Sequence, residues 1–195
     1  MTEGTAKFFL LQVNDALFPI GAYSHSQGLE TYIQNGIVHD EKTAEEYIKN
    51  KIKWNFATTE LLSVKLAYES AEAERLEELE ELEEILEASR IPMEQRDAVR
   101  KMGSRFVKTI EKLDLEINET GIYKEYVTAR KGKNISHSCV YGVFCSALGI
   151  ELEEALEHYL YAQTSAMVTN CVKTIPLSQS VGQKLLSRCF FEFQE

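Results

Sequence analysis

The amino-acid sequence predicts an all-α fold, a single-domain helical bundle of about eight to ten helices over residues 1–195. Apolar residues recur at helical spacing along most of the chain, and no stretch alternates long enough to indicate a strand. Only three prolines and ten glycines interrupt 195 residues. There is also no internal repeat and no linker-like segment that would separate two domains.

The first predicted helix covers residues 8–17, where Phe9, Val13 and Leu17 repeat at helical spacing. Pro19 lies in the turn that follows, because proline fixes φ and removes a backbone donor. This segment therefore predicts a helix followed by a turn near the N-terminus.

Three further helices are predicted from capping boxes, in which Ser or Thr is followed three residues later by Glu or Gln. The pairs are Ser24 with Gln27, Thr43 with Glu46, and Ser180 with Gln183. They predict helices over about residues 25–34, 43–56 and 180–193.

The remaining helices follow from apolar periodicity between breakers. Pro92 stands at the start of one of them, Gly149 ends another, and Pro176 ends the longest. The predicted ranges are about 59–69 continuing into a charged stretch, 93–113, 123–129, 136–148 and 151–173.

The formal net charge is −10, from 21 basic and 31 acidic side chains. A nucleic-acid-binding protein needs a basic surface to displace counterions from phosphates, and anionic membranes attract basic segments. The composition therefore predicts no nucleic-acid partner and no membrane association.

Most of this charge lies in residues 72–87, which hold nine Glu and one Arg. Leu76, Leu79 and Leu82 give the segment one thin apolar stripe, so the simpler interpretation is a solvated amphipathic helix. The alternative is an acidic docking face for a basic partner, and that hypothesis depends on charge alone.

We expect a cytoplasmic protein. The apolar patch at residues 8–11 is shorter than a signal-peptide core of roughly seven or more residues, and no apolar run is long enough to span a bilayer. The cysteines show no C-x-x-C spacing and have apolar or small neighbours, as buried thiols in a reducing compartment do. They are Cys139, Cys145, Cys171 and Cys189.

Known catalytic and metal-binding patterns are missing from the sequence. It contains no phosphate-binding loop, no H-E-x-x-H, no Glu-x-x-His pair and no G-x-S-x-G. We therefore predict no catalytic residue, no metal site and no bound cofactor. His25, between two serines, is the one candidate for an all-α enzyme or a metal carrier, although a solvated histidine at a helix start is the simpler interpretation.

The predicted helix 151–173 carries a face of aromatic and small residues that includes Tyr159 and Tyr161. Core packing and a helix–helix dimer seam explain this face about equally well, because small residues allow helices to approach closely in both cases. Both interpretations stay open at the level of the sequence.

Two stretches are more elaborate than packing requires, since each joins a polar turn containing Gly or Pro to a helix. Asp15 to Glu30 matches D-x-x-x-P-x-G-[AS]-[FY]-x-x-S-x-G-L-E, and Val172 to Gln183 matches V-[RK]-x-[IVL]-P-L-[GS]-Q-x-x-[GQ]-Q. In both stretches the chain resembles the urease accessory protein UreF family. Weaker agreement is found around Ser89 to Gly103 and in His137 to Gly142.

The resemblance implies an all-α homodimer with no catalysis of its own. Such proteins bridge the scaffold protein UreD, also called UreH, and the GTPase UreG on apo-urease. The resemblance further implies that they couple GTP hydrolysis to nickel insertion, so nickel and GTP are expected to belong to the partner complex and not to this chain.

The resemblance also suggests roles for individual residues. Lys173 is expected to face a partner as a cation at the end of the long helix, where the family often has Arg. Glu30, Ser26 and Gln27 are expected on the same surface, although local capping also explains Gln27. Further expectations are that Gln179 and Gln183 hold the turn after Pro176, and that Tyr161 and His158 lie at the dimer interface.

Overall fold

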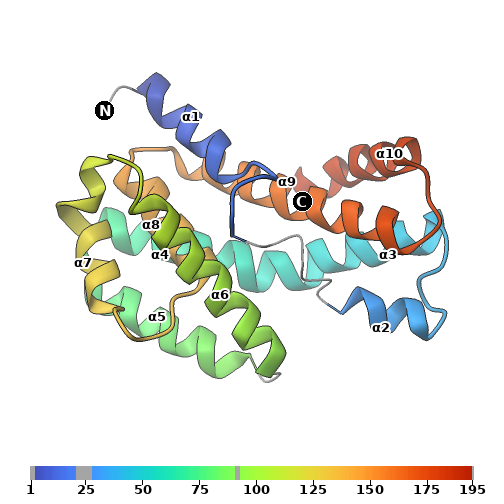
Figure 1. The fold of residues 1–195 in the computed structure, drawn as a ribbon, viewed down its shortest axis with the longest axis horizontal. Helices are drawn as coiled ribbons and strands as arrows, with labels where there is room; N and C mark the ends of the chain where they lie inside the picture. Colours follow the sequence, from blue (N-terminus) through green and yellow to red (C-terminus); the bar gives the residue numbers. More distant parts are fainter. Residues whose placement is uncertain (1–2, 21–27, 91–92, 195) are drawn as a thin grey trace.

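The computed structural model describes residues 3–20, 28–90 and 93–194, and every regular element in this part of the chain is a helix (Figure 1). The predicted all-α bundle of about eight to ten helices is confirmed. The α-helices are α1 (Glu3–Val13), α2 (Leu29–Gln34), α3 (Glu41–Lys51), α4 (Leu62–Glu72), α5 (Leu76–Ser89), α6 (Met93–Ile110), α7 (Gly121–Ala129), α8 (His137–Ala147), α9 (Leu152–Thr174) and α10 (Gln179–Cys189). Other helical segments are the π-helix η2 (Ile52–Leu61) and the 3₁₀ turns η3 (Glu116–Asn118) and η4 (Phe190–Gln194). Among the described residues, no helix combines the length and apolar character that a membrane span needs.

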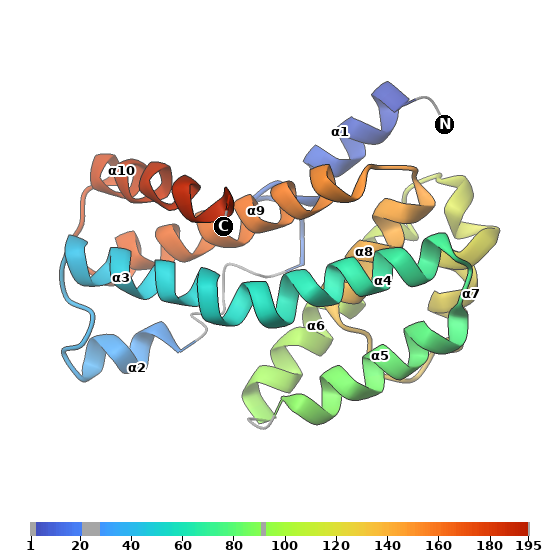
Figure 2. The same ribbon diagram turned by 180° about the vertical axis from the view of Figure 1, so that it is seen from behind.

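Two long helical segments organise the molecule. Helix α3, the π-helix η2 and helix α4 follow one another without a break, so they form one continuous rod from Glu41 to Glu72 (Figure 2). Helix α9 packs against all three parts of this rod and also contacts α8 and α10. The other helices are arranged around these two segments.

The buried apolar residues form two clusters. The first cluster joins α1, α4 to α8 and the beginning of α9, and it includes Leu10, Val64, Phe106, Tyr126 and Phe144. The second cluster joins α2, α3, η2, the C-terminal half of α9 and α10, and it includes Leu29, Ile48, Phe56, Val168 and Leu185. Leu61, at the end of the π-helix, packs against both clusters.

Glycines permit the closest contacts in the first cluster. A Cβ atom at Gly142 on α8 would overlap the backbone carbonyl oxygen of Val64 on α4, and a Cβ at Gly103 on α6 would overlap that of Ile135. Helices α4 and α8 therefore touch along their backbones, as do α6 and the segment that leads into α8. The glycines in the two weaker family stretches thus have a packing role.

Two of the predicted capping boxes are wrong, because another residue caps the helix. Helix α3 begins at Glu41, and its cap is Asp40, whose carboxylate accepts a 2.8 Å hydrogen bond from the Thr43 backbone N–H. Helix α10 begins at Gln179, where the Ser178 hydroxyl accepts from the backbone N–H of Val181. In both cases the residue that closes the first turn precedes the predicted one.

The other helix boundaries differ from the predictions by a few residues. Helix α1 ends at Val13, and the Asn14 side chain donates to the Leu10 carbonyl, which competes with a further helical turn. The predicted charged continuation is a separate helix α5, since Glu74 adopts φ 55 and reverses the chain. The third predicted box, Ser24 with Gln27, lies outside the described residues.

Candidate partner-binding surfaces

Four of the residues predicted to bind partners are exposed on the part of the molecule built around the second cluster. Glu30 is in the first turn of α2, Lys173 in the last turn of α9, and Gln179 and Gln183 are on α10. Their apolar neighbours Leu29, Ile175 and Leu185 are buried in that cluster. The polar side chains are thus held outside by a fixed apolar interior, a geometry suited to a recognition surface.

The turn after α9 is built from backbone bonds and the Ser178 cap. The backbone N–H of Ile175 donates to the Cys171 carbonyl at 2.8 Å, and that of Leu177 donates to the Ile175 carbonyl at 2.7 Å. Gln179 is the first residue of α10, and its side chain is exposed. The role of the two glutamines in holding this turn stays a prediction.

Three other candidates, His25, Ser26 and Gln27, lie outside the described residues. Within residues 3–20, 28–90 and 93–194, no three His, Cys, Asp or Glu side chains are grouped so that they could hold a metal ion.

The aromatic face of α9 divides into a buried and an exposed part. Tyr159 is buried, whereas Tyr161 is half exposed and its ring centroid lies 6.2 Å from that of Phe190 in η4. Phe191 next to it is 77% exposed. We call Tyr161, Phe190 and Phe191 the aromatic patch, and His158 is a half-buried residue one turn before it on α9.

A buried polar group lies where η2, α8 and α9 meet. The His137 ring stacks on Tyr159, with centroids 5.6 Å apart, and the Tyr159 hydroxyl is 3.5 Å from His137 Nδ1 and from a Glu60 carboxylate oxygen. Glu60 also pairs with Arg90 at 3.3 Å. Burial lowers the pKa of His137 to about 4, so this histidine is neutral near physiological pH.

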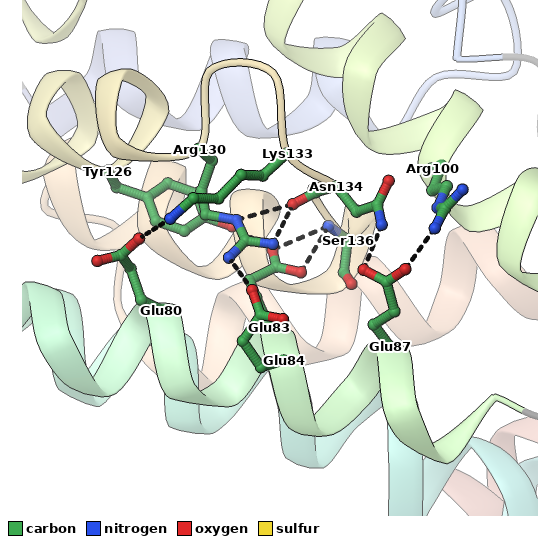
Figure 3. A network of polar contacts seen from close by, with 10 residues as sticks. All are labelled: Glu80, Glu83, Glu84, Glu87, Arg100, Tyr126, Arg130, Lys133, Asn134 and Ser136. Atoms are coloured by element: carbon green, nitrogen blue, oxygen red, sulfur yellow. Dashed lines mark hydrogen bonds and ion pairs between the residues drawn. The ribbon is translucent and has the colours of Figure 1, made fainter.

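The acidic helix α5 faces a basic loop that sequence reasoning did not connect with it (Figure 3). Arg130, whose side chain is 1% exposed, pairs with Glu84 at 2.6 Å and donates from Nε to the Asn134 carbonyl at 2.8 Å. Lys133 pairs with Glu80 at 2.7 Å. Arg130 and Lys133, in the segment between α7 and α8, therefore supply counter-charges for α5 from within the same chain.

The same network continues to the end of α5. Glu87 accepts hydrogen bonds from Asn134 and from Arg100 on α6, and these two bonds lower the pKa of its carboxyl. The predicted amphipathic helix agrees with α5, where Leu79 and Leu86 are buried and Glu77 and Glu81 are exposed. The side of α5 that faces Arg130 and Lys133 is not available as a docking face, because its carboxylates already have partners.

The center of this network is inside the protein. The Glu83 carboxylate is 1% exposed, accepts two hydrogen bonds from the Ser136 backbone N–H at 2.8 and 3.0 Å, and accepts another from the Tyr126 hydroxyl (Figure 3). Burial, followed by the nearby Glu83, raises the pKa of Tyr126. A glutamate within an apolar repeat of leucines is the sequence signal that points to this buried position.

Comparison of the sequence with models of known protein families identifies the family of this chain. The sequence model of the family described as UreF matches residues 38–190, more than three quarters of the 195-residue chain. The chain belongs to the UreF family. The matched range includes Lys173, Gln179 and Gln183 and every residue of the Figure 3 network.

Membership in the UreF family assigns the chain to the urease accessory proteins, which are not enzymes. The resemblance recognised in the sequence is therefore confirmed. The described residues of this UreF-family chain present exposed polar and aromatic groups on a helical framework, and these are the groups from which protein–protein contacts are made.

Proposed function

We propose that the chain is a non-enzymatic adaptor in urease maturation. It bridges the scaffold protein UreD/UreH and the GTPase UreG on apo-urease, so that nickel is inserted in a GTP-dependent step. The observation that carries the proposal is the UreF family match over residues 38–190. Nickel is the cargo of the assembly and GTP the substrate of the partner, and neither needs a site on this chain.

The surface near the end of α9 supports a partner contact there. Lys173 is exposed in the last helical turn, where a cation is also favoured by the helix dipole. Ile175, two residues after Lys173, is buried in the second cluster. The position of the Lys173 backbone is therefore fixed while its side chain is presented to a partner, which we propose to be the GTPase.

The aromatic patch supports the proposed homodimer. Tyr161 and Phe190 are both exposed and their ring centroids lie 6.2 Å apart, and Phe191, the next residue in the chain, is 77% exposed. Aromatic residues are enriched in the buried centres of subunit interfaces. We propose that a second copy of the chain covers this patch, in the cytoplasm, where the urease assembly forms.

The test is co-elution of the chain with the scaffold protein, the GTPase and apo-urease, followed by assay of urease activation. We expect Lys173→Ala to weaken GTPase binding and activation while the variant stays folded. Lys124→Ala is the matched control, because Lys124 is also an exposed lysine and belongs to α7, which lies at the other end of the molecule (Figure 1).

Two results would contradict the proposal at different levels. A parent chain that does not co-elute with either partner removes the adaptor role. A Lys173→Ala variant that binds and activates as the parent does leaves the adaptor role standing and removes Lys173 from the contact.

A further inference from the structure

Helix α6 carries a row of exposed cations on the side that faces away from the core. Lys101, Arg105 and Lys108 are all exposed. At about 100° per residue they lie within about 60° of one another around the helix axis, and the buried Phe106 is on the other side. The Arg105 side chain donates to the Ile20 carbonyl at 3.5 Å, which is a neutral acceptor. We call these three cations the basic row.

The charges next to the basic row do not neutralise it. Residues 98–110 contain four cations and no carboxylate. On either side of this range, Asp97 pairs with Arg100 at 3.8 Å, and Glu111 is exposed directly after the helix ends. In the part of the chain that the structure describes, no member of the basic row forms an ion pair with a carboxylate.

Helix α5 carries the opposite charge in a similar arrangement. It contains seven Glu and no cation, and five of these carboxylates have partners within the chain, namely those of Glu78, Glu80, Glu83, Glu84 and Glu87. Glu77 and Glu81 are exposed and have no such partner among the described residues. They lie one helical turn apart, away from the buried Leu79 and Leu86. We call them the acidic pair.

Both groups are unfavourable in an isolated molecule, because like charges three or four positions apart on a helix repel each other. The helix dipole favours a cation in the last turn, which accounts for Lys108 but not for Lys101 or Arg105. A solvated helix face gains more from mixed signs, as on α3, where Glu45 pairs with Lys49 at 3.2 Å. A contact with the opposite charge would remove the repulsion in both helices.

The two groups match each other in spacing. Glu77 and Glu81 are four residues apart, as are Lys101 and Arg105, so each pair extends about 6 Å along its helix. When α5 of one molecule lies beside α6 of another, both carboxylates therefore meet both cations at once. No ion pair joins these four side chains inside one molecule, as far as the described residues show, so they are left for a second one.

We infer that a second copy of this chain places its α5 on α6, with Glu77 and Glu81 against Lys101 and Arg105. Each copy carries both halves of the contact. A nucleic acid or an anionic membrane fits less well, because its further phosphates would meet a chain of net charge −10. The contact does not depend on the proposed function. It is also separate from the aromatic patch, which follows α10, since α5 and α6 lie on the opposite side of the molecule from α10 (Figure 1).

Salt dependence is the first test. Exposed ion pairs are individually weak and are screened by salt, so this contact should form only at low ionic strength. The average mass of the full chain is measured by light scattering at increasing protein concentration, in about 0.02 M and about 0.5 M salt. We expect the mass in low salt to rise toward roughly twice its high-salt value or more. A mass that is the same in both salt concentrations overturns the inference.

Charge reversal identifies the two surfaces. One variant combines Lys101→Glu with Arg105→Glu, and the other combines Glu77→Lys with Glu81→Lys. Each variant alone has like charges on α5 and α6 and is expected to lose the salt-sensitive association. An equimolar mixture of the two variants has opposite charges across the contact again, so it is expected to regain the association of the parent.

A control separates the contact from an effect of net charge. Lys124→Glu with Lys131→Glu changes the net charge as the first variant does, at two exposed lysines in α7 and in the turn after it. This control is expected to associate as the parent does. The inference is overturned if the control loses association equally, if either reversed variant still associates, or if the mixture of the two does not.

Two polyanions test the other occupants of the basic row. Polyglutamate and a short single-stranded RNA are each added to the parent and to the Lys101→Glu, Arg105→Glu variant in low salt. If the parent keeps a constant mass while either polyanion co-elutes with it and not with the variant, the basic row accepts another anion and the second copy is the wrong occupant.

Discussion

The buried carboxylate of Glu83 on α5 accepts two hydrogen bonds from the backbone N–H of Ser136, the residue that precedes helix α8. This contact joins an acidic helix to the entry of the most deeply buried helix of the first cluster. The Glu83 side chain is therefore a structural link between segments 53 positions apart in the chain.

Replacement of Glu83 should destabilise the fold strongly. Glu83→Ala leaves the Ser136 N–H and the Tyr126 hydroxyl buried without an acceptor, and we expect a loss of about 3 kcal/mol in the free energy of unfolding. Urea denaturation measures it, with Glu81→Ala as the exposed control, expected to change stability by less than about 0.5 kcal/mol. Equal effects of the two substitutions would show that the buried hydrogen bonds of Glu83 do not contribute to the free energy of unfolding.

Enlarging Gly142 should separate α8 from α4. The Cβ of Gly142→Ala overlaps the Val64 carbonyl oxygen, and the backbone there cannot move without disturbing the first cluster, so we expect a loss of roughly 1–3 kcal/mol or more. Gly4→Ala on α1 is the control, because nothing lies within 4 Å of the added carbon. Thermal unfolding compares the two, and a Gly142→Ala variant as stable as Gly4→Ala would contradict the close packing of α4 and α8.

His137 should make the protein sensitive to mild acid. Its pKa is lowered by burial to about 4 in the folded protein, against 6.5 for a free histidine, so between these values the unfolded chain binds a proton that the folded chain does not. Stability is therefore fully present above about pH 6.5 and falls as the pH drops toward 4, by up to about 3 kcal/mol from this residue.

The measurement is the free energy of unfolding in urea, for the parent and for His137→Phe, at about pH 7.5 and about pH 4.5. The stability difference between the two proteins should shift in favour of Phe by about 2–3 kcal/mol at the lower pH. His137→Gln serves as a second non-titrating variant. If the stability difference is the same at both pH values, His137 takes up a proton in the folded protein as readily as in the unfolded chain, and its pKa is not lowered by burial.

The aromatic patch should control the oligomeric state. Tyr161→Asp places a carboxylate beside Phe190, and we expect the solution mass to fall from about twice to once the chain mass of 22.2 kDa. Ile85→Asp, on α5, is the control for a new charge on an exposed apolar position. Light scattering after gel filtration gives the mass, and a parent protein that is already monomeric would exclude this interface.

Helices whose ends are marked by unambiguous breakers were predictable from the sequence almost to the residue. The predicted ranges 136–148 and 151–173 correspond to α8 (His137–Ala147) and α9 (Leu152–Thr174), because Gly149 and Pro176 leave little choice. Gly149 adopts φ 66, the left-handed conformation expected after a helix.

Helix starts were harder to predict because neighbouring residues compete for the cap. Asp40 and Thr43 are both good N-caps, as are Ser178 and Ser180, and the sequence alone does not rank them. The structure selects the earlier residue of each pair. The choice depends on where the first turn begins relative to the buried face, which is a tertiary property.

The candidate surfaces were predictable only where the family resemblance suggests a role for the residue. Lys173 and Tyr161 are exposed as partner contacts must be, while their roles stay predictions. The α5 network could not be predicted, because it pairs charges about 50 residues apart in the chain. The π-helix η2 could not be predicted either, because a π-helix has no simple apolar period.

The two buried clusters share their longest elements, and this has a consequence for how the protein melts. The rod from Glu41 to Glu72 and helix α9 each contribute side chains to both clusters. Neither cluster can therefore unfold without disrupting a helix that the other cluster needs. Such sharing joins the two halves into one cooperative unit. Heating should therefore give a single calorimetric peak whose measured enthalpy equals the van't Hoff value, although the interior has two centres.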